Sequence, residues 1–327
     1  MFREKIAVIV NDFGAVMFDG IRLKSVAGME GLEILDVPGG CLCCSAIEDF
    51  REALQSVISR GVQRVFIEAT GLADAAQVQR DLAFMRFPID STFCVVDALN
   101  LHRFRTLFQI VDVQIAAADV LLISKTDLAS PERISALYQH LDRINPRAVR
   151  VVLDNGRIET ETSVQLFASQ DRFIPHAAHH AQEHLLQENV TAFQIHLPHT
   201  VDFTVLEQAI TRLPANMVRM KGVLRFSDSP KNVVLLNVVG GARNYLPLKN
   251  TRYEQTSEEQ IAHKQSELFA IGQNVSSEEV LAAFAGLDVR IEAGTVRSVG
   301  FVEEHHSEHH HSEHHRNSRT AFDEKQP

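Results

Sequence analysis

The first 155 residues alternate between short apolar runs and helical patterns, and this alternation constrains the fold more than any other feature of the sequence. Most of the runs are continuous rather than alternating, which is typical of parallel strands buried on both faces. Amphipathic helices are expected between them. We therefore predict an α/β fold with a doubly wound, mostly parallel sheet. The expected strands are Ile6–Val10, Val65–Ile67, Phe93–Val96, Val120–Ile123 and Val149–Leu153.

Two of the intervening helices carry clear boundary signals. The pattern over Ala46–Arg60 places one apolar face along a helix, with Ser45 and Glu48 as a capping box and Gly61 as the stop. The pattern over Pro131–Ile144 begins with proline in the first turn. Both segments are predicted to be crossover helices.

The second half of the chain has a different pattern. A polar, histidine-rich stretch over residues 171–190 is interpreted as a linker, which leaves 1–170 as the first domain. Residues 191–292 combine helices with hairpin-connected strands, which predicts a small α+β domain. The helices are expected at Thr204–Leu213 and Ser277–Ala285, the second with a capping box of Ser276 and Glu279. Residues 293–327 form a histidine-rich tail that we expect to be disordered.

Composition excludes several classes of protein. The net charge of −10 argues against nucleic-acid binding, which needs a basic face. No apolar run is long enough to span a membrane, and the apolar stretch at the N-terminus is too short for a signal peptide. Three of the four cysteines fall within four residues, so they favour metal binding in a reducing cytoplasm over a disulfide framework.

Polar motifs follow four of the predicted strands. They are Asn11-Asp12-Phe13-Gly14, Glu68-Ala69-Thr70-Gly71, Asp97, and Ser124-Lys125-Thr126-Asp127. Because ligands bind at the carboxyl ends of strands in open α/β sheets, these residues indicate one active face.

The chemistry of two of these motifs suggests a nucleotide. In Ser124-Lys125-x-Asp127, a carboxylate can accept both N–H groups of a guanine edge while the lysine stem lies along the base. In Glu68-x-x-Gly71, a carboxylate can hold Mg²⁺ through water and the glycine N–H can face a phosphate. Each motif alone is equally compatible with a helix-capping loop or a turn.

The strongest local signal is Gly40-Cys41-Leu42-Cys43-Cys44. Cys41 and Cys43 point the same way in an extended segment, and Cys44 precedes a helix N-terminus that favours thiolate. Such a cluster suits Zn²⁺ or Cu(I) held for transfer. The alternatives are inert buried cysteines or a strained disulfide between Cys43 and Cys44. Cys94 lies within an apolar strand and is interpreted as a core residue.

Histidines form two further groups. His176, His179, His180 and His184 would share one helix face, and metal binding and a solvated linker are equally good explanations. The histidines of residues 305–315 alternate with Ser-Glu pairs and suggest a loose metal buffer.

Taken together, these residues resemble the CobW family of P-loop GTPases, whose members handle metals. The similarity extends from residue 5 to about residue 290. The matching stretches are IAVIVNDFG, GGCLCC, FIEATGLAD, CVVDALN, QIAAADVLLISKTDL, INPRAV, VRMKGVLRF and ELFAIGQNVSSEEVLAAF.

The resemblance implies a role for each motif. Cys41, Cys43 and Cys44 would carry zinc to a client protein in a step coupled to GTP hydrolysis. Lys125 and Asp127 would read guanine, with Ser124 in place of the family's usual Asn. Glu68 and Gly71 would belong to the Walker B and switch region, and Asn11-Asp12 departs mildly from the usual Asn-Glu.

One family motif is missing. The sequence contains no G-x-x-x-x-G-K-[ST] loop, which in the family precedes the strand matching Ile6–Val10 and holds the phosphates and Mg²⁺. Without that segment, a central strand is lost and catalysis should fail. We expect a start site placed too far downstream, or a truncated gene, rather than an evolved GTPase-dead protein.

The resulting hypothesis is a GTP-dependent, cytoplasmic zinc chaperone that binds GTP or GDP with Mg²⁺ and a metal-dependent client protein, and neither nucleic acid nor membrane. The first alternative is a zinc-binding or buffering protein without hydrolysis. The second is a chaperone of the same family for cobalt or iron insertion. The sequence leaves open whether the protein forms a homo-oligomer.

Overall fold

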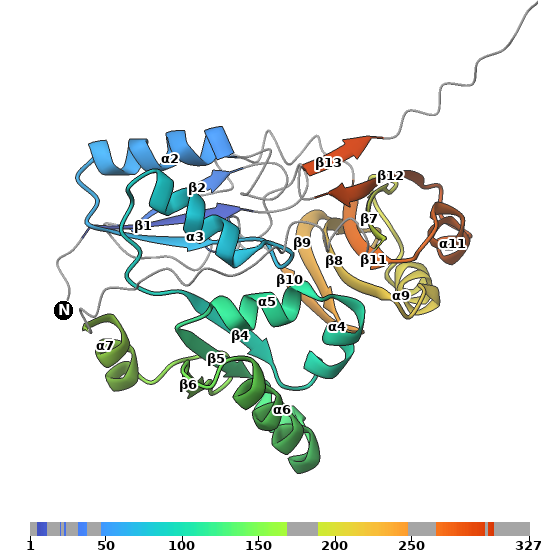
Figure 1. The fold of residues 1–327 in the computed structure, drawn as a ribbon. Helices are drawn as coiled ribbons and strands as arrows, with labels where there is room; N and C mark the ends of the chain where they lie inside the picture. Colours follow the sequence, from blue (N-terminus) through green and yellow to red (C-terminus); the bar gives the residue numbers. More distant parts are fainter. Residues whose placement is uncertain are drawn as a thin grey trace, which may run out of the picture.

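The computed structural model describes residues 5–11, 20, 23, 32–37, 47–168, 189–247, 266–297 and 300–303. Its strands form two parallel sheets and one antiparallel sheet (Figure 1). The strands are β1 Ile6–Asn11, β2 Leu32–Val37, β3 Arg64–Glu68, β4 Phe93–Asp97, β5 Val120–Ser124, β6 Val149–Val152, β7 Val190–His196, β8 Met217–Phe226, β9 Ser229–Val239, β10 Ala242–Pro247, β11 Glu267–Gln273, β12 Arg290–Arg297 and β13 Gly300–Glu303. The helices are α2 Ile47–Ser59, α3 Ala75–Phe84, α4 Leu101–Leu107, α5 Ile110–Ala117, α6 Pro131–Ile144, α7 Thr160–Ala168, α9 Phe203–Arg212 and α11 Ser277–Ala283, with a 3₁₀ turn η1 at Thr126–Leu128.

The N-terminal region contains the predicted parallel strands. Strands β1, β2 and β3 pair in the order β2-β1-β3, and β4, β5 and β6 pair in the order β4-β5-β6. All four pairings are parallel. The α/β class with parallel sheets is therefore confirmed, and β2 is a strand that the sequence pattern did not reveal.

The strands do not form the single sheet that was expected. Within the described residues the ladder is interrupted between β3, which pairs only with β1, and β4, which pairs only with β5. Burial of the strands on both faces is also incomplete. Val95 in β4 is 65% exposed and Val152 in β6 is 52% exposed, because a strand at the margin of a ladder has fewer neighbours to cover it.

Each parallel sheet has its own apolar core. Helices α2 and α3 cover the first sheet, where Phe50 and Leu54 of α2 pack with Ile9. Helices α5 and α6 cover the second sheet, where Leu137 and Leu141 of α6 pack on the buried strand β5. Helix α6 begins and ends at the predicted residues because its start is specified locally, by Ser130 as N-cap and Pro131 in the first turn.

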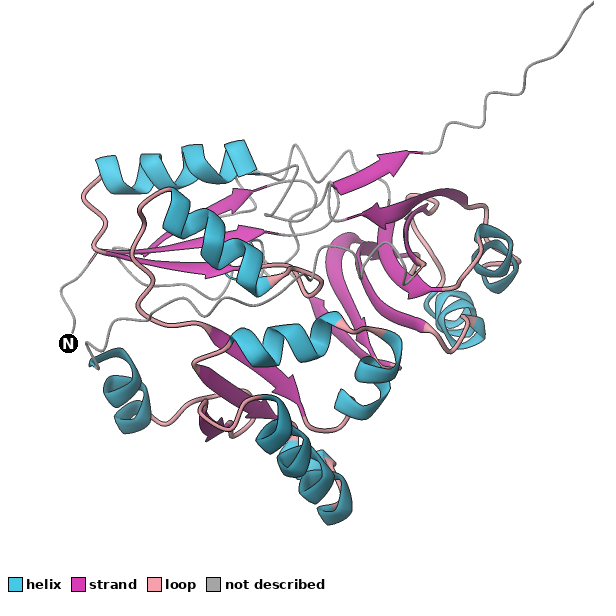
Figure 2. Cartoon of the chain, viewed as in Figure 1, coloured by secondary structure: helices cyan, strands magenta, loops and turns pink. Residues whose placement is uncertain are grey.

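The C-terminal region is the predicted α+β domain. Its sheet has seven strands in the order β10-β9-β8-β11-β7-β12-β13, all paired antiparallel. Helices α9 and α11 lie on one face of this sheet (Figure 2). The fully buried Phe193 and Phe284 belong to the apolar core there. The predicted capping box of Ser276 and Glu279 is present at the start of α11.

The opposite face of this sheet packs on the N-terminal region. Phe108 and Ile110, at the junction of α4 and α5, share a buried cluster with Phe269 and Ile271 of β11. Across the same boundary, Gln273 Nε2 donates a hydrogen bond to the Leu107 carbonyl oxygen at 2.6 Å. The two regions therefore share an apolar interface rather than a simple tether.

The described residues correct one boundary. Strand β12 reaches Arg297 and β13 ends at Glu303, so residues 293–303 include strands of the sheet and do not belong with a disordered tail. The histidine groups at 176–184 and 305–315 lie outside the described residues. Among the described helices, none is long and apolar enough to cross a membrane.

Candidate functional site

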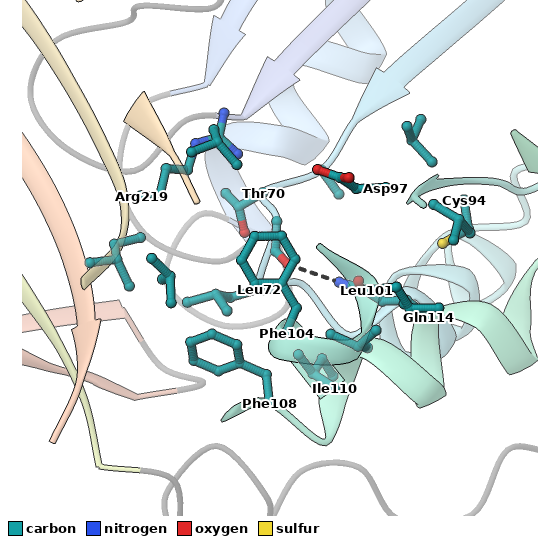
Figure 3. Close-up of a pocket in the computed structure, with 18 of the residues that line it drawn as sticks. Thr70, Leu72, Cys94, Asp97, Leu101, Phe104, Phe108, Ile110, Gln114 and Arg219 are labelled. Carbon is teal, nitrogen blue, oxygen red and sulfur yellow. Dashed lines mark hydrogen bonds between the residues drawn. The ribbon is translucent and has the colours of Figure 1, made fainter. Parts of the chain in front are cut away.

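A cavity of about 430 Å³ lies where the two parallel sheets meet the C-terminal sheet (Figure 3). It opens at the carboxyl ends of β1, β3, β4 and β5, as the polar motifs predicted. Its lining includes five of the predicted site residues, which are Asn11, Glu68, Gly71, Ser124 and Lys125.

Lys125 and Asp97 form the principal ion pair of the cavity. Lys125 Nζ lies 2.7 Å from Asp97 Oδ2. The lysine backbone is left-handed, with φ of 58° and ψ of 31°, a conformation that few non-glycine residues adopt. Such backbone strain occurs most often at functional sites and in sharp turns. The Ser124-Lys125-Thr126-Asp127 segment therefore bends sharply at the end of β5.

Asp97 also organises the beginning of α4. Its Oδ1 accepts hydrogen bonds from the backbone N–H groups of Leu99 and Asn100, both at 3.0 Å. Its Oδ2 accepts a third from Asn100 Nδ2 at 2.9 Å. The carboxylate thus fixes Lys125 and the turn into α4 together. The sequence placed Asp97 at a strand end without assigning it a role.

The loop after β3 is held by hydrogen bonds from helix α5. Gln114 Nε2 of α5 donates hydrogen bonds to the carbonyl oxygens of Gly71, at 3.1 Å, and Ala73, at 2.8 Å. Thr70 is only 7% exposed and lines the cavity, and its hydroxyl has no hydrogen-bond partner among the described residues. A buried hydroxyl of this kind costs free energy unless a ligand or water satisfies it. The loop therefore presents an available polar group to a ligand.

Asn11 and Ser124 bond chiefly to the backbone. Asn11 is 2% exposed and its Nδ2 donates to the Val37 carbonyl oxygen at 3.3 Å. Ser124 Oγ donates to the Val96 carbonyl oxygen at 3.2 Å, which ties β5 to β4. Both side chains stabilise the strand ends that form the cavity.

The remaining predicted site residues lie elsewhere or outside the described residues. Asp127 is exposed in η1 and is not among the residues that line the cavity. Asp12, Cys41, Cys43 and Cys44 are not among the described residues. Among the residues that the structure does describe, no group of three or more His, Cys, Asp or Glu side chains is arranged to bind a metal ion.

Cys94 is packed less completely than a core residue. It is a partly buried residue of the β4–β5 core and also lines the cavity. Burial raises the pKa of its thiol to about 11, so the neutral thiol persists at physiological pH. Cys94 is therefore a poor thiolate donor and differs in this from a metal-binding cysteine.

Two cationic side chains of the cavity come from the C-terminal sheet. Arg219 and the 6%-exposed Lys221, both on β8, line it beside the loops of the N-terminal region. Sequence alone assigns these two residues no role beyond their place in the stretch VRMKGVLRF, because nothing local to that stretch shows which of its side chains will face the N-terminal region.

Comparison with known proteins identifies both regions. Residues 2–152 match the model of the CobW/HypB/UreG nucleotide-binding domain, and residues 190–287 match the Cobalamin synthesis protein cobW C-terminal domain.

Individual relatives span most of the chain. The zinc chaperone YjiA of Escherichia coli strain K12 is 26% identical over 303 residues, which cover 86% of this chain and 90% of the relative. The zinc chaperone CobW of Pseudomonas aeruginosa is 24% identical, with 72% and 73% covered. The crystal structure of the Zn(II)-bound YjiA GTPase from E. coli is 19% identical, with 88% and 99% covered and a TM-score of 0.36. Since the two domain models occur in this order over most of the chain, the protein belongs to the CobW family, with a nucleotide-binding domain followed by a CobW C-terminal domain.

Proposed function

We propose that this protein is a GTP-dependent zinc chaperone that carries zinc on Cys41, Cys43 and Cys44 and transfers it to a client protein. The observation that carries the nucleotide part is the cavity, where Lys125, Asp97 and the loop Glu68–Gly71 meet at the ends of β5, β4 and β3. The zinc part is supported by relatives that are named zinc chaperones.

Within this proposal the N-terminal loops divide the nucleotide between them. Lys125 lies along the guanine and Asp127 accepts its N–H groups once the exposed turn η1 closes over the base. Asn11, at the end of β1, and the adjacent Asp12 would contact the nucleotide, and Ser124 anchors the turn that carries Lys125. Gly71 offers a backbone N–H to a phosphate.

The cavity also fits a magnesium nucleotide chemically. It has the buried unsatisfied hydroxyl of Thr70, and Glu68 supplies an exposed carboxylate at the same loop. Oxygen donors of this kind suit Mg²⁺, which keeps most of its water ligands. When bound, the ion neutralises phosphate charge, and Glu68 would hold it through water.

Zinc is the cargo in this scheme. Helix α2 begins at Ile47, three residues after Cys44. Its N-terminal N–H groups and dipole favour thiolate at nearby cysteines. Two or three thiolates with an open position allow the metal to be passed on.

Zinc stoichiometry tests the metal site directly. We expect about one tightly bound zinc ion per chain, lost in the triple variant Cys41→Ser/Cys43→Ser/Cys44→Ser. Cys94→Ser is the matched control and should keep the metal. Retention of zinc by the triple variant would place the site elsewhere. Stoichiometric cobalt or iron after growth in defined medium would replace the zinc assignment.

A second candidate is zinc binding without hydrolysis. It is favoured by the interruption of the ladder between β3 and β4 in the part of the chain that the structure describes. Phosphate release from GTP with Mg²⁺, measured on the chain with and without a restored upstream segment, separates the candidates. We expect little or no release from this chain alone. Release at a normal rate would show that other residues hold the phosphates.

A further inference from the structure

Arg219 stands at an irregularity of strand β8. Residues Arg219 and Ile271 are paired across β8 and β11, but the next pair is Met217 with Gly272, so the register shifts by one residue. As a result the consecutive residues Val218 and Arg219 both reach the boundary with the N-terminal region, Val218 in the interdomain cluster and Arg219 in the cavity. β-bulges commonly redirect side chains next to active sites.

The Arg219 guanidinium lies against the loop after β3. A Cβ atom added to Gly71 would stand 3.6 Å from Arg219 Nη1. In Figure 3, Arg219 lies beside Thr70, whose buried hydroxyl has no partner among the described residues. The loop is thus enclosed between Gln114 of α5 and Arg219 of β8. A small anionic group at this point would meet a guanidinium, a hydroxyl and a backbone N–H.

The same sheet also touches the turn between β4 and α4, which contains Asn100. Gly240, in the turn between β9 and β10, has a φ of +59°, and a Cβ atom there would lie 2.7 Å from Asn100 Oδ1. Asn100 bonds to Asp97, which pairs with Lys125. The C-terminal sheet therefore contacts both ends of the cavity, with Arg219 at the phosphate side and the Gly240 turn next to Asp97.

We propose that Arg219 is a phosphate-binding residue contributed by the C-terminal domain, contacting the terminal phosphate of the bound guanine nucleotide. This inference rests on the proposed nucleotide-binding function and adds to it a residue that links the nucleotide state to the C-terminal sheet. An arginine suits the role because its planar fork matches phosphate oxygens and keeps its charge at all physiological pH values. Lys221 adds positive charge to the same wall.

Nucleotide affinity provides the first test. The full chain and its Arg219→Gln variant are titrated calorimetrically with GDP and with the slowly hydrolysed analogue GTPγS, both with Mg²⁺. We expect the Kd for GTPγS to rise about tenfold, which is about 1.4 kcal/mol, and the Kd for GDP to change by less than about twofold. Arg219→Lys should lie between, with a rise of about threefold, because it keeps the charge and loses the fork.

Arg243→Gln is the matched control. Arg243 belongs to the same sheet, is half-buried and pairs with Glu207 away from the cavity. Its loss should leave both affinities unchanged. Equal thermal unfolding of the Arg219 and Arg243 variants would show that a lost affinity does not arise from misfolding.

Hydrogen exchange gives a second readout. GTPγS should protect the amides of residues 69–73 and of β8 in the wild type, and protection of β8 should disappear in Arg219→Gln. If the wild type binds GTPγS and Arg219→Gln retains both the affinity and the protection, the role of Arg219 is overturned while the proposed function stands. If the wild type binds neither nucleotide, the nucleotide-binding function itself fails, and the role of Arg219 fails with it.

Discussion

The two regions of this protein complete their sheets in different ways. In the C-terminal region seven antiparallel strands form one continuous ladder among the described residues, and eight of the ten residues of β8 are buried. In the N-terminal region the six parallel strands that the structure describes form two ladders of three, and apolar residues such as Val95 and Val152 stay exposed.

The two kinds of sheet differ in how the chain brings a pairing partner to each strand. Antiparallel strands can pair through short hairpins, as β8, β9 and β10 do at one side of this sheet. Strands β11 and β7 in the middle of the sheet pair with strands that are distant in the sequence. Parallel strands need a neighbour brought by a long crossover. Among the described residues the parallel ladder is interrupted between β3 and β4, and the polar strand ends line the cavity there. Stability is expected to reside mainly in the C-terminal sheet and ligand binding in this cavity.

The largest expected effect separates the two regions by stability. Phe193 is fully buried in the C-terminal core, so Phe193→Ala should lower the free energy of unfolding by about 3–5 kcal/mol. Val95→Ala on the exposed face of β4 should cost less than about 1 kcal/mol. Urea denaturation followed by circular dichroism measures both. Similar costs at the two positions would contradict the comparison.

The free energy of unfolding should fall at alkaline pH because of the partly buried Cys94 thiol in β4. Because the folded pKa of Cys94 is raised to about 11, the protonated thiol is favoured in the folded state. Its contribution is fully present below the unfolded pKa, about 8.5, and is lost as pH rises towards 11.

We expect a loss of about 3 kcal/mol over that range, given 1.36 kcal/mol per pKa unit. It is measured as the difference in unfolding free energy between wild type and Cys94→Ala at a series of pH values. A difference that does not change with pH would show that β4 is open to solvent at Cys94.

Matched aspartates compare helix starts in the two regions. Asp97 accepts three hydrogen bonds at the start of α4 and pairs with Lys125, whereas Asp202 accepts one from the Val205 N–H at the start of α9. Asp97→Ala should cost about 2 kcal/mol and Asp202→Ala about 1 kcal/mol. Only the first cost should fall at high salt, because it includes an ion pair. Equal costs that do not depend on salt would show that the ion pair between Asp97 and Lys125 does not contribute to the free energy of unfolding.

The smallest effect concerns two serine caps. Ser276 belongs to a complete capping box in α11, whereas Ser130 in α6 accepts a single hydrogen bond of 3.4 Å from the Arg133 N–H. Ser276→Ala should cost about 1 kcal/mol and Ser130→Ala about 0.5 kcal/mol. Thermal unfolding of both variants measures the difference. A larger cost at Ser130 would show that its helix start stabilises the N-terminal region more than its bond geometry suggests.

Much of the fold was predictable where the signals are local. Helix α6 was predicted with its observed ends, and the predicted strands agree with β1, β3, β4, β5 and β6 to within a residue or two. Strand β2 was missed because Glu33 and Asp36 interrupt its apolar run. Helix α5 was missed because it is short and, apart from Asp112 and Gln114, apolar all round, so it shows no amphipathic period.

The candidate site was predictable in part for the same reason. Glu68, Gly71, Ser124 and Lys125 follow strands, and the strands bring them to one cavity. Their chemical roles stay predictions. The sequence named Thr70 only as a member of the motif after β3. Its hydroxyl is buried without a hydrogen-bond partner among the described residues, and only the structure shows this.

The sequence by itself determined the succession of strands and helices, the α+β character of the second domain and the gathering of polar residues at the strand ends. These features depend on local periodicity, capping and the constant direction of parallel strands. Only the tertiary structure decided that the parallel strands form two ladders and that Arg219 reaches Gly71. Both depend on contacts between distant segments, which no local pattern encodes. The position of Arg219 further depends on the register shift in β8 and on the packing of the C-terminal sheet against the N-terminal region.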